Sequence, residues 1–147
     1  MKVFFKELRV STSSLAELVD ITREVEQAVA ESGVLNGICL IHAPHATAAI
    51  IANEHEAGLM KDVLTKLQRD YPRGAGWMHD RIDDNANAHL ASAFIGSSRT
   101  FPVMDGRLVR GTWQEVLLLE FDGPRGRLSL IHISEPTRPR LSSYAVF

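Results

Sequence analysis

The hydrophobic and polar positions of the chain follow two spacings, the two-residue period of strands and the 3.6-residue period of helices. Extended segments rich in β-favouring or apolar residues are predicted at 3–10, 37–42, 48–52, 100–103, 108–109 and 116–121. The short, nearly continuous apolar runs among them indicate strands that are buried on both faces. An Asp105-Gly106 pair, typical of a hairpin turn, separates two of these strands.

Helical spacing of apolar residues covers three segments, residues 15–33, about 57–69 and 86–95. Ser14 and Glu17 form a capping-box pattern at the start of the first segment, and Gly33 ends it as a helix C-cap would. A chain of 147 residues has the size of one domain and can bury a substantial core.

Composition excludes several classes of partner. The net charge of −2 leaves no basic stripe for nucleic acid, and no window approaches the roughly 18 apolar residues that span a bilayer. The single cysteine, Cys39, lies in an apolar run and is predicted to be a small buried hydrophobe, with a catalytic thiol as the less favoured alternative. These features predict a protein of the reducing cytoplasm, with neither a nucleic-acid nor a membrane partner.

The segment from His79 to His89 is the most polar stretch of the chain. It contains two histidines, three carboxylates, one arginine and two asparagines between two apolar helical patterns. A solvated loop is one interpretation. Neutral imidazoles close to carboxylates are also the combination used for metal ligation and proton transfer. Together with polar residues on other apolar elements, this segment is predicted to form part of a site.

Further candidates are polar residues attached to apolar segments. His45, Thr47 and Glu54 flank the run at 48–52, although a core histidine bonded to a backbone carbonyl is the alternative for His45. Gly96-Ser97-Ser98 ends the third helix with free backbone amides, a possible anion site. Arg125 suits a bidentate grip on phosphate or carboxylate, with a solvated turn arginine as its alternative, and Gln114 is a further candidate substrate contact.

The C-terminal segment departs from the rest of the chain. The string L-I-H-I-S-E-P-T-R, which begins at Leu130, resembles the translation of a sequencing adapter. We therefore predict one domain over residues 1–127 and an atypical, non-native tail over 128–147, although residues 128–133 have the composition of a strand. His132 is accordingly excluded from any site. An ordinary flexible terminus is the alternative.

Three sequence blocks together resemble one family. They are P-H-A-T-A-A-I-I-A-N-E at 44–54, H-D-R-I-D-D-N-A-N-A-H-L at 79–90, and G-R-L-V-R-G-T-W-Q-E-V with E-F-D-G-P-R between 106 and 125. Their order and spacing are similar to those of the YjbQ family, also called the secondary thiamine-phosphate synthase family. The resemblance implies an α+β fold, a compact sandwich with a mainly antiparallel sheet and packed helices, in members that form homotrimers. It also implies a weak thiamine-phosphate synthase activity.

The resemblance assigns family positions to particular residues. The histidine of the first block falls on His45 and its asparagine-glutamate pair on Asn53 and Glu54, while the second block supplies His79 and His89. The G-T-W-Q block falls on residues 111–114. The chain departs from the usual pattern at three positions, Ala46, Asn87 and Arg110. These departures bear on the identity of the substrate more than on the fold.

Two functional hypotheses follow. In the first, an enzyme holds a divalent metal, zinc by preference, on His45, His79 and His89, with Glu54 and His79 as catalytic acid/base groups. A small phosphorylated metabolite would be the partner, and its predicted contacts are Thr47, Asn85, Ser97, Ser98, Thr112, Gln114 and Arg125. In the second, a homotrimer binds a metal or small anion without turnover. A large distance between Glu54 and the histidines would favour the binding protein. A purely structural role for the histidines is a third possibility.

Overall fold

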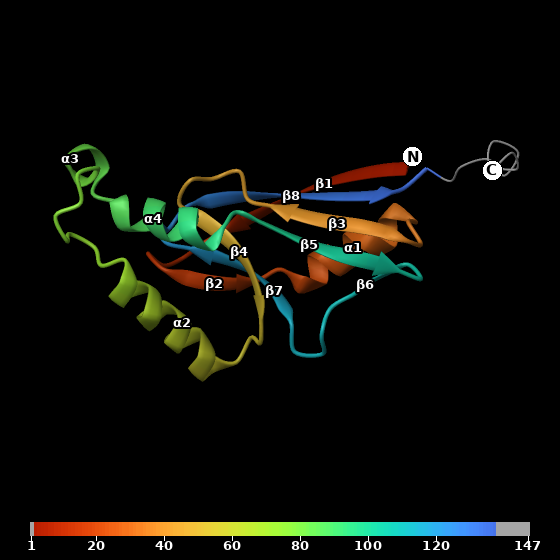
Figure 1. Ribbon diagram of the computed structural model, residues 1–147, viewed down its shortest axis with the longest axis horizontal. Helices are drawn as coiled ribbons and strands as arrows, with labels where there is room; N and C mark the ends of the chain where they lie inside the picture. The colour runs from red at the N-terminus through yellow and green to blue at the C-terminus, as the bar shows by residue number, and fades with distance from the viewer. Residues whose placement is uncertain (1, 138–147) are drawn as a thin grey trace, which may run out of the picture.

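The computed structural model describes residues 2–137, which form two antiparallel sheets and four helices (Figure 1). The larger sheet has the order β1 (Lys2–Ser11), β8 (Gly126–Glu135), β3 (Gly37–His42), β5 (Ser98–Met104) and β6 (Arg107–Leu108). The smaller has the order β2 (Glu17–Asp20), β7 (Glu115–Glu120) and β4 (Ala48–Asn53). The predicted α+β sandwich with antiparallel sheets is confirmed.

The helices are α1 (Thr22–Ser32), α2 (Ala57–Asp70), α3 (Asp80–Asp83) and α4 (Ala86–Ile95). The bounds of α4 agree with the predicted segment 86–95, and α2 extends the predicted segment by one residue. The short α3 was not predicted. Within residues 2–137, none of these helices is long and apolar enough to cross a membrane.

The smaller sheet is the middle layer of the molecule. On one side, Ile50 and Leu118 pack with α1 and the larger sheet in the main core. On the other side, Ala49 and Leu119 pack against Leu67 of α2 and the alanines of α4. Because both faces of β7 are covered, a continuous apolar sequence is stable there. Burial of Cys39 in the main core raises the pKa of its thiol to about 12, so the cysteine acts as an apolar residue.

The helix predicted over residues 15–33 is wrong in its first third. Glu17 does accept a backbone hydrogen bond at 2.7 Å, but the donor is Ser13 and not the Ser14 of the predicted capping box. However, Leu18 and Val19 pair with β7, and the helix begins only at Thr22, whose backbone N–H donates to Asp20 Oδ1 at 2.9 Å. Pairing with a central strand overrides the local helical spacing. Gly33 ends the helix in the left-handed conformation, as predicted.

The domain boundary predicted at residue 127 falls inside β8. This strand lies between β1 and β3, and it pairs with β1 from Gly126 to Glu135. Its side chains alternate, with Ser129, Ile131 and Ile133 buried against the core. The sheet therefore continues to residue 135, because residues 128–133 have the period of a strand with one buried face. The rest of the predicted tail, residues 138–147, lies outside the described residues.

Candidate functional site

The two histidines of the polar segment lie against each other. Their ring centroids are 4.5 Å apart in an edge-to-face arrangement, with His79 just before α3 and His89 on α4. They line a cavity of about 320 Å³ together with Trp77, Met78, Ala86 and Leu90. His79 Nε2 is buried and has no hydrogen-bond partner among the described residues. The pair therefore includes one buried imidazole nitrogen whose hydrogen-bonding capacity is not used by the described residues.

Local hydrogen bonds hold this arrangement in place. Asp80 accepts a bond from the Ala86 backbone at 2.9 Å, which ties the start of α3 to the start of α4. Asp84 adopts a left-handed conformation (φ 55°) that ends α3. The backbone N–H of His89 donates to Asn85 in the first turn of α4, at 3.2 Å. The polar sequence thus forms a tight double turn rather than an open loop.

Asn85 connects the histidine pair to the turn between β7 and β8. Its Nδ2 donates to Asp122 Oδ2 at 2.9 Å, and the same carboxylate oxygen lies 2.9 Å from Arg125 Nη2. Arg125 Nε also donates to the Asp122 carbonyl at 2.7 Å. Asn85 Oδ1 is buried without a partner among the described residues. We call His79, His89, Asn85, Asp122 and Arg125 the α4 corner.

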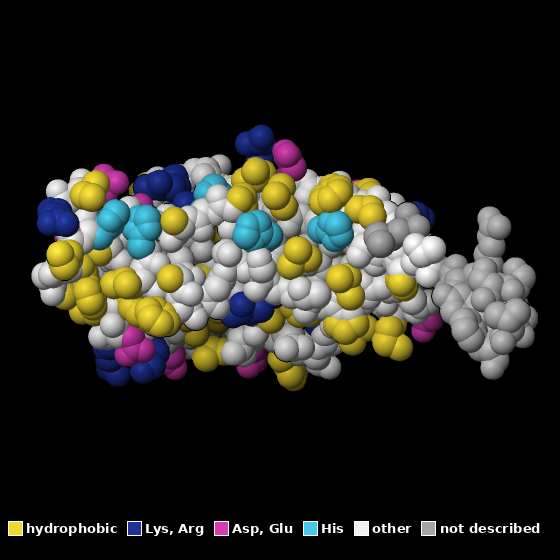
Figure 2. Space-filling view, turned by 45° about the horizontal axis from the view of Figure 1, so that its top comes forward, with side chains coloured by type: hydrophobic (Ala, Val, Ile, Leu, Met, Phe, Trp, Pro, Cys, Tyr) yellow, Lys and Arg dark blue, Asp and Glu magenta, His cyan; other side chains and the backbone are white. Residues whose placement is uncertain are grey.

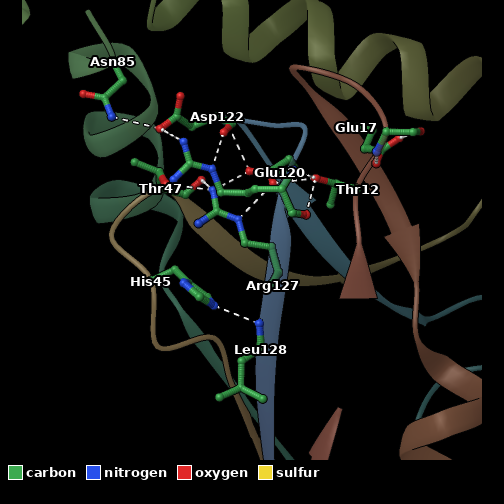
Figure 3. A network of polar contacts seen from close by, with 11 residues as sticks. Thr12, Glu17, His45, Thr47, Asn85, Glu120, Asp122, Arg127 and Leu128 are labelled. Atoms are coloured by element: carbon green, nitrogen blue, oxygen red, sulfur yellow. Dashed lines mark hydrogen bonds and ion pairs between the residues drawn. The ribbon is translucent and has the colours of Figure 1, made fainter. Parts of the chain in front are cut away.

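Behind the α4 corner lies a buried ion pair between Glu120 and Arg127 (Figure 3). Arg127 Nε donates to Glu120 Oε1 at 2.9 Å, and Arg127 Nη2 donates to Glu120 Oε2 and to Thr47 Oγ1, the latter at 2.7 Å. Thr12 donates its hydroxyl to Glu120 at 2.8 Å. The Asp122 backbone donates to Glu120 at 3.0 Å, so the network joins four segments of chain to the corner.

The network keeps Glu120 ionised. Burial disfavours the carboxylate, but hydrogen bonds from Arg127, Asp122 and Thr12 outweigh it and hold the pKa of Glu120 below its usual value of 4.5. A folded-state pKa below the unfolded value means that this group stabilises the fold above about pH 4.5. That contribution is lost as the pH falls through the folded pKa.

His45 lies in the loop between β3 and β4, and it does not join the other two histidines. Its Nε2 accepts a hydrogen bond from the Leu128 backbone at 2.9 Å (Figure 3). Burial and the nearby charge of Arg127 lower the pKa of His45. Among residues 2–137, no three His, Cys, Asp or Glu side chains lie close enough together to hold a metal ion. The structure therefore corrects the predicted three-histidine ligand set, since only His79 and His89, which belong to one short segment, lie against each other.

Ser97 and Ser98 lie at the start of β5, beside the loop that carries His45. Ser98 Oγ is 2.6 Å from His42 Nδ1, and the Ser97 carbonyl accepts a bond from Ala43 at 2.9 Å. The Ser98 hydroxyl and the Ser97 carbonyl are thus engaged with β3 and the loop that follows it. They show no contact with Arg125.

Glu54, Thr112 and Gln114 belong to a different part of the molecule. Glu54 follows the far end of β4. The seven positions from Thr47 to Glu54 span about 23 Å at about 3.3 Å per residue of extended chain. It lines a separate cavity of about 320 Å³ with Asp20, His55, Glu56, Trp113 and Glu115. Gln114 Oε1 accepts a bond from the Gly111 backbone at 2.6 Å, so it stabilises its own turn instead of reaching the histidines. Thr112 is exposed in the same turn.

Four residues of this region were not predicted from the sequence, namely Thr12, Glu120, Asp122 and Arg127. Glu120 could have been found, since a carboxylate at the end of the apolar run 116–121 needs a buried partner. Arg127 lies seven residues after Glu120 and on another strand. No local sequence pattern identified it as that partner.

The two-sheet sandwich and its α4 corner define the class of protein, a small α+β domain with a polar cluster of side chains between a helix and a strand turn. A family description, UPF0047 protein YjbQ-like, matches residues 6–136. The chain belongs to this family, which confirms the resemblance seen in the three sequence blocks. The match runs past residue 127 and agrees with the position of β8.

Relatives share both the sequence and the fold. A UPF0047 protein from Archaeoglobus fulgidus is 43% identical over 125 residues, covering 85% of this chain and 97% of its own. YugU from Bacillus subtilis is 40% identical over 130 residues, covering 86% and 96%. The crystal structure of a YbjQ-like protein of unknown function from Sulfolobus solfataricus P2 has a TM-score of 0.89 at 55% identity, covering 90% of this chain and 96% of its own.

Proposed function

We propose that this chain binds a small phosphorylated metabolite at the α4 corner. The observation that carries the proposal is the state of Arg125, whose side chain is half exposed although Asp122 holds its guanidinium in a fixed orientation. Two of the five guanidinium N–H donors are used by Asp122, and the others are available to phosphate oxygens. The unpartnered atoms of His79 and Asn85 add polar groups to the same corner.

Binding without turnover is favoured over catalysis by the position of Glu54. An acid/base group has to reach the reacting atoms within hydrogen-bond distance, directly or through one water. Glu54 lies at the opposite end of β4 from the loop of His45 and Thr47, and it lines another cavity. A single chain therefore lacks the predicted base beside its histidine pair.

Arg125→Gln tests the phosphate site. Hydrogen bonds to charged groups contribute about 1.5–3 kcal/mol, so we expect the affinity for inorganic phosphate or pyrophosphate to fall by about tenfold to a hundredfold. Isothermal titration calorimetry measures the change. Arg9→Gln is the matched control, since Arg9 is exposed on β1 with only Glu7 nearby, 3.8 Å away, and it should bind as the wild type does. Equal affinity in the Arg125 variant would contradict the proposed site.

We further propose that the histidine pair holds a divalent metal, with zinc the natural choice for two imidazoles. A zinc site needs more than two ligands, and a phosphate oxygen or water would complete it. Such an ion would bind phosphate oxygens beside Arg125. His45 is not part of this proposal, since its Nε2 is engaged by Leu128.

His89→Ala tests the metal. Elemental mass spectrometry on protein purified without chelators should find about one zinc per chain in the wild type and almost none in the variant, because a lone imidazole holds zinc weakly. His55→Ala removes a histidine that lies at the other cavity, beside Asp20, and should retain the metal. Zinc that persists in His89→Ala, or is absent from the wild type, would refute the site.

We also propose that the chain acts as a homotrimer in the cytoplasm. The outer face of the larger sheet presents Val3, Phe5, Ile38 and Met104, each between 44% and 68% exposed. Figure 2 shows apolar and histidine side chains interspersed with polar and charged groups on the face that it presents. Exposed apolar residues that share a face are typical of surfaces that pack against another chain. The cytoplasm is proposed because the one cysteine is free and buried.

Thiamine-phosphate synthase activity is the second candidate, and it is supported by the family blocks and the proposed phosphate site. A metal and an arginine together neutralise a leaving pyrophosphate. His79 would act directly, whereas Glu54 would act as base only if a neighbouring protomer supplied it. An assay of pyrophosphate release from a pyrimidine pyrophosphate and a thiazole phosphate distinguishes the two candidates. Release that His79→Ala abolishes would favour the enzyme.

A further inference from the structure

His45 is connected to β8 through one of its ring nitrogens. Its Nε2 accepts a hydrogen bond of 2.9 Å from the Leu128 backbone, at the start of β8 (Figure 3). Its own backbone N–H donates to the Ala43 carbonyl at 2.8 Å, which keeps the loop tight. Backbone N–H groups only donate, so the bonded Nε2 has to be the unprotonated nitrogen of the ring.

This hydrogen bond determines the position of the proton. A neutral imidazole carries one N–H, and if Nε2 is the acceptor, the proton resides on Nδ1. A protonated ring would place an N–H on Nε2 against the N–H of Leu128, which would break the bond. The ring therefore presents a donor on the edge that is turned away from β8 in Figure 3.

We propose that His45 is kept as the neutral Nδ1–H tautomer and donates a hydrogen bond to an anionic oxygen of the ligand. The donor role rests on the proposed phosphate-binding function, whereas the tautomer follows from the contact with Leu128 alone. This assignment replaces the role of metal ligand that the sequence suggested. It makes His45 a positioning donor for an anion and removes it from proton transfer.

The charges around the ring favour the same state. The groups that face it are Arg127 on β8, Glu120 on β7 and Arg125 in the turn between those strands. Burial and the charge of Arg127 lower the pKa of His45 below its ordinary value of 6.5, although Glu120 partly opposes them. A neutral donor adds no further positive charge beside the arginines, while it still satisfies one oxygen of a phosphate.

Nitrogen-15 NMR of the histidine rings in the full-length chain tests the tautomer. Above pH 7 we expect His45 to show a proton-bearing Nδ1 and a bare Nε2, and addition of inorganic phosphate should shift the Nδ1 resonance. A proton on Nε2 under these conditions would overturn the inference whatever phosphate does. A correct tautomer in a chain that binds no phosphate would refute the proposed function and, with it, the donor role.

Substitutions test the donor separately. In His45→Asn the side-chain amide places a donor close to the position of Nδ1, so phosphate affinity should stay within about threefold of the wild type. His45→Ala removes the donor and should weaken binding about tenfold or more. If the wild type binds phosphate and both variants bind it equally well, the donor role is wrong while the phosphate site stands.

The pH dependence of stability provides an independent readout. A folded-state pKa below the unfolded value means that the unfolded chain binds more protons, so the contribution of His45 is complete above about pH 6.5 and is lost as the pH falls through the folded pKa. The wild type should therefore lose more unfolding free energy than His45→Asn between pH 7 and pH 5. Denaturant unfolding at a series of pH values measures this difference. If the unfolding free energies of the wild type and His45→Asn change equally with pH, His45 is not held in the neutral form.

Discussion

Glu120→Leu is expected to reduce the unfolding free energy by about 3–5 kcal/mol, the usual cost of removing one partner from a buried ion pair. Glu120 is completely buried, and Arg127 is only 4% exposed. Without the carboxylate, the Arg127 guanidinium would remain in the interior, and Thr47 would be its one remaining hydrogen-bond partner among residues 2–137. Urea unfolding monitored by tryptophan fluorescence and circular dichroism measures the loss.

The double variant Glu120→Leu with Arg127→Met is the matched control. Replacing both members of a buried pair by apolar residues is often neutral or stabilising, so most of the lost stability should return. Phosphate binding should not return, because Asp122 and Thr47 would still lack the contacts that hold them near the α4 corner. Recovery of both stability and binding would show that the pair has no role in positioning the site.

Gly123→Ala is the second substitution with a large expected effect. A Cβ atom at this position would collide with the Ser14 carbonyl oxygen, and it would lie 2.9 Å from both Glu120 Cγ and Thr12 Oγ1. The backbone oxygen cannot move without displacing the Gly123 N–H bond to Leu15, at 3.1 Å. Overpacking of this kind costs about 1–3 kcal/mol, and here it acts on the turn that carries Asp122 and Arg125.

We therefore expect Gly123→Ala to lower the melting temperature and also to weaken phosphate binding. Gly126→Ala is the control, three residues along the same turn, where an added Cβ meets nothing within 4 Å. That variant should retain both the stability and the affinity of the wild type. A Gly123 variant with unchanged stability and binding would show that the turn can shift freely, and the corner would then not be preorganised.

Much of the fold could be predicted from local pattern. The strands at 37–42, 48–52 and 116–121 and the helix at 86–95 have strong apolar periods and no competing partner, and each formed as predicted. Asp105 and Gly106 both have positive φ angles, 51° and 75°, which is the hairpin geometry that this pair favours. Residues 17–20 form a strand because they pair with the edge of β7. That pairing depends on a distant segment, so the local sequence contains no signal for it.

The sequence predicted which residue types occur in the candidate site. It did not predict which of these residues lie close together in space. His79 and His89 meet because they lie within one short double turn, so their proximity follows from local sequence. His45 and Glu54 are only nine positions apart, yet a strand separates them and carries them to opposite ends of one layer. The two ends of an extended strand are separated by about 3.3 Å per residue, so residues that are close in sequence can lie far apart in space.

By itself, the sequence determined most of the elements, the hairpin, the family and the polar character of the segment 79–89, because these depend on periodicity and on contacts within a few residues. Only the tertiary structure decided that Glu120 and Arg127 form a buried pair, and that Asn85 and Arg125 both contact the Asp122 carboxylate. It also decided that His45 faces a backbone N–H instead of a metal. Those outcomes depend on which strands pair and in which register, and a one-residue shift in register would turn every side chain of a strand to the other face.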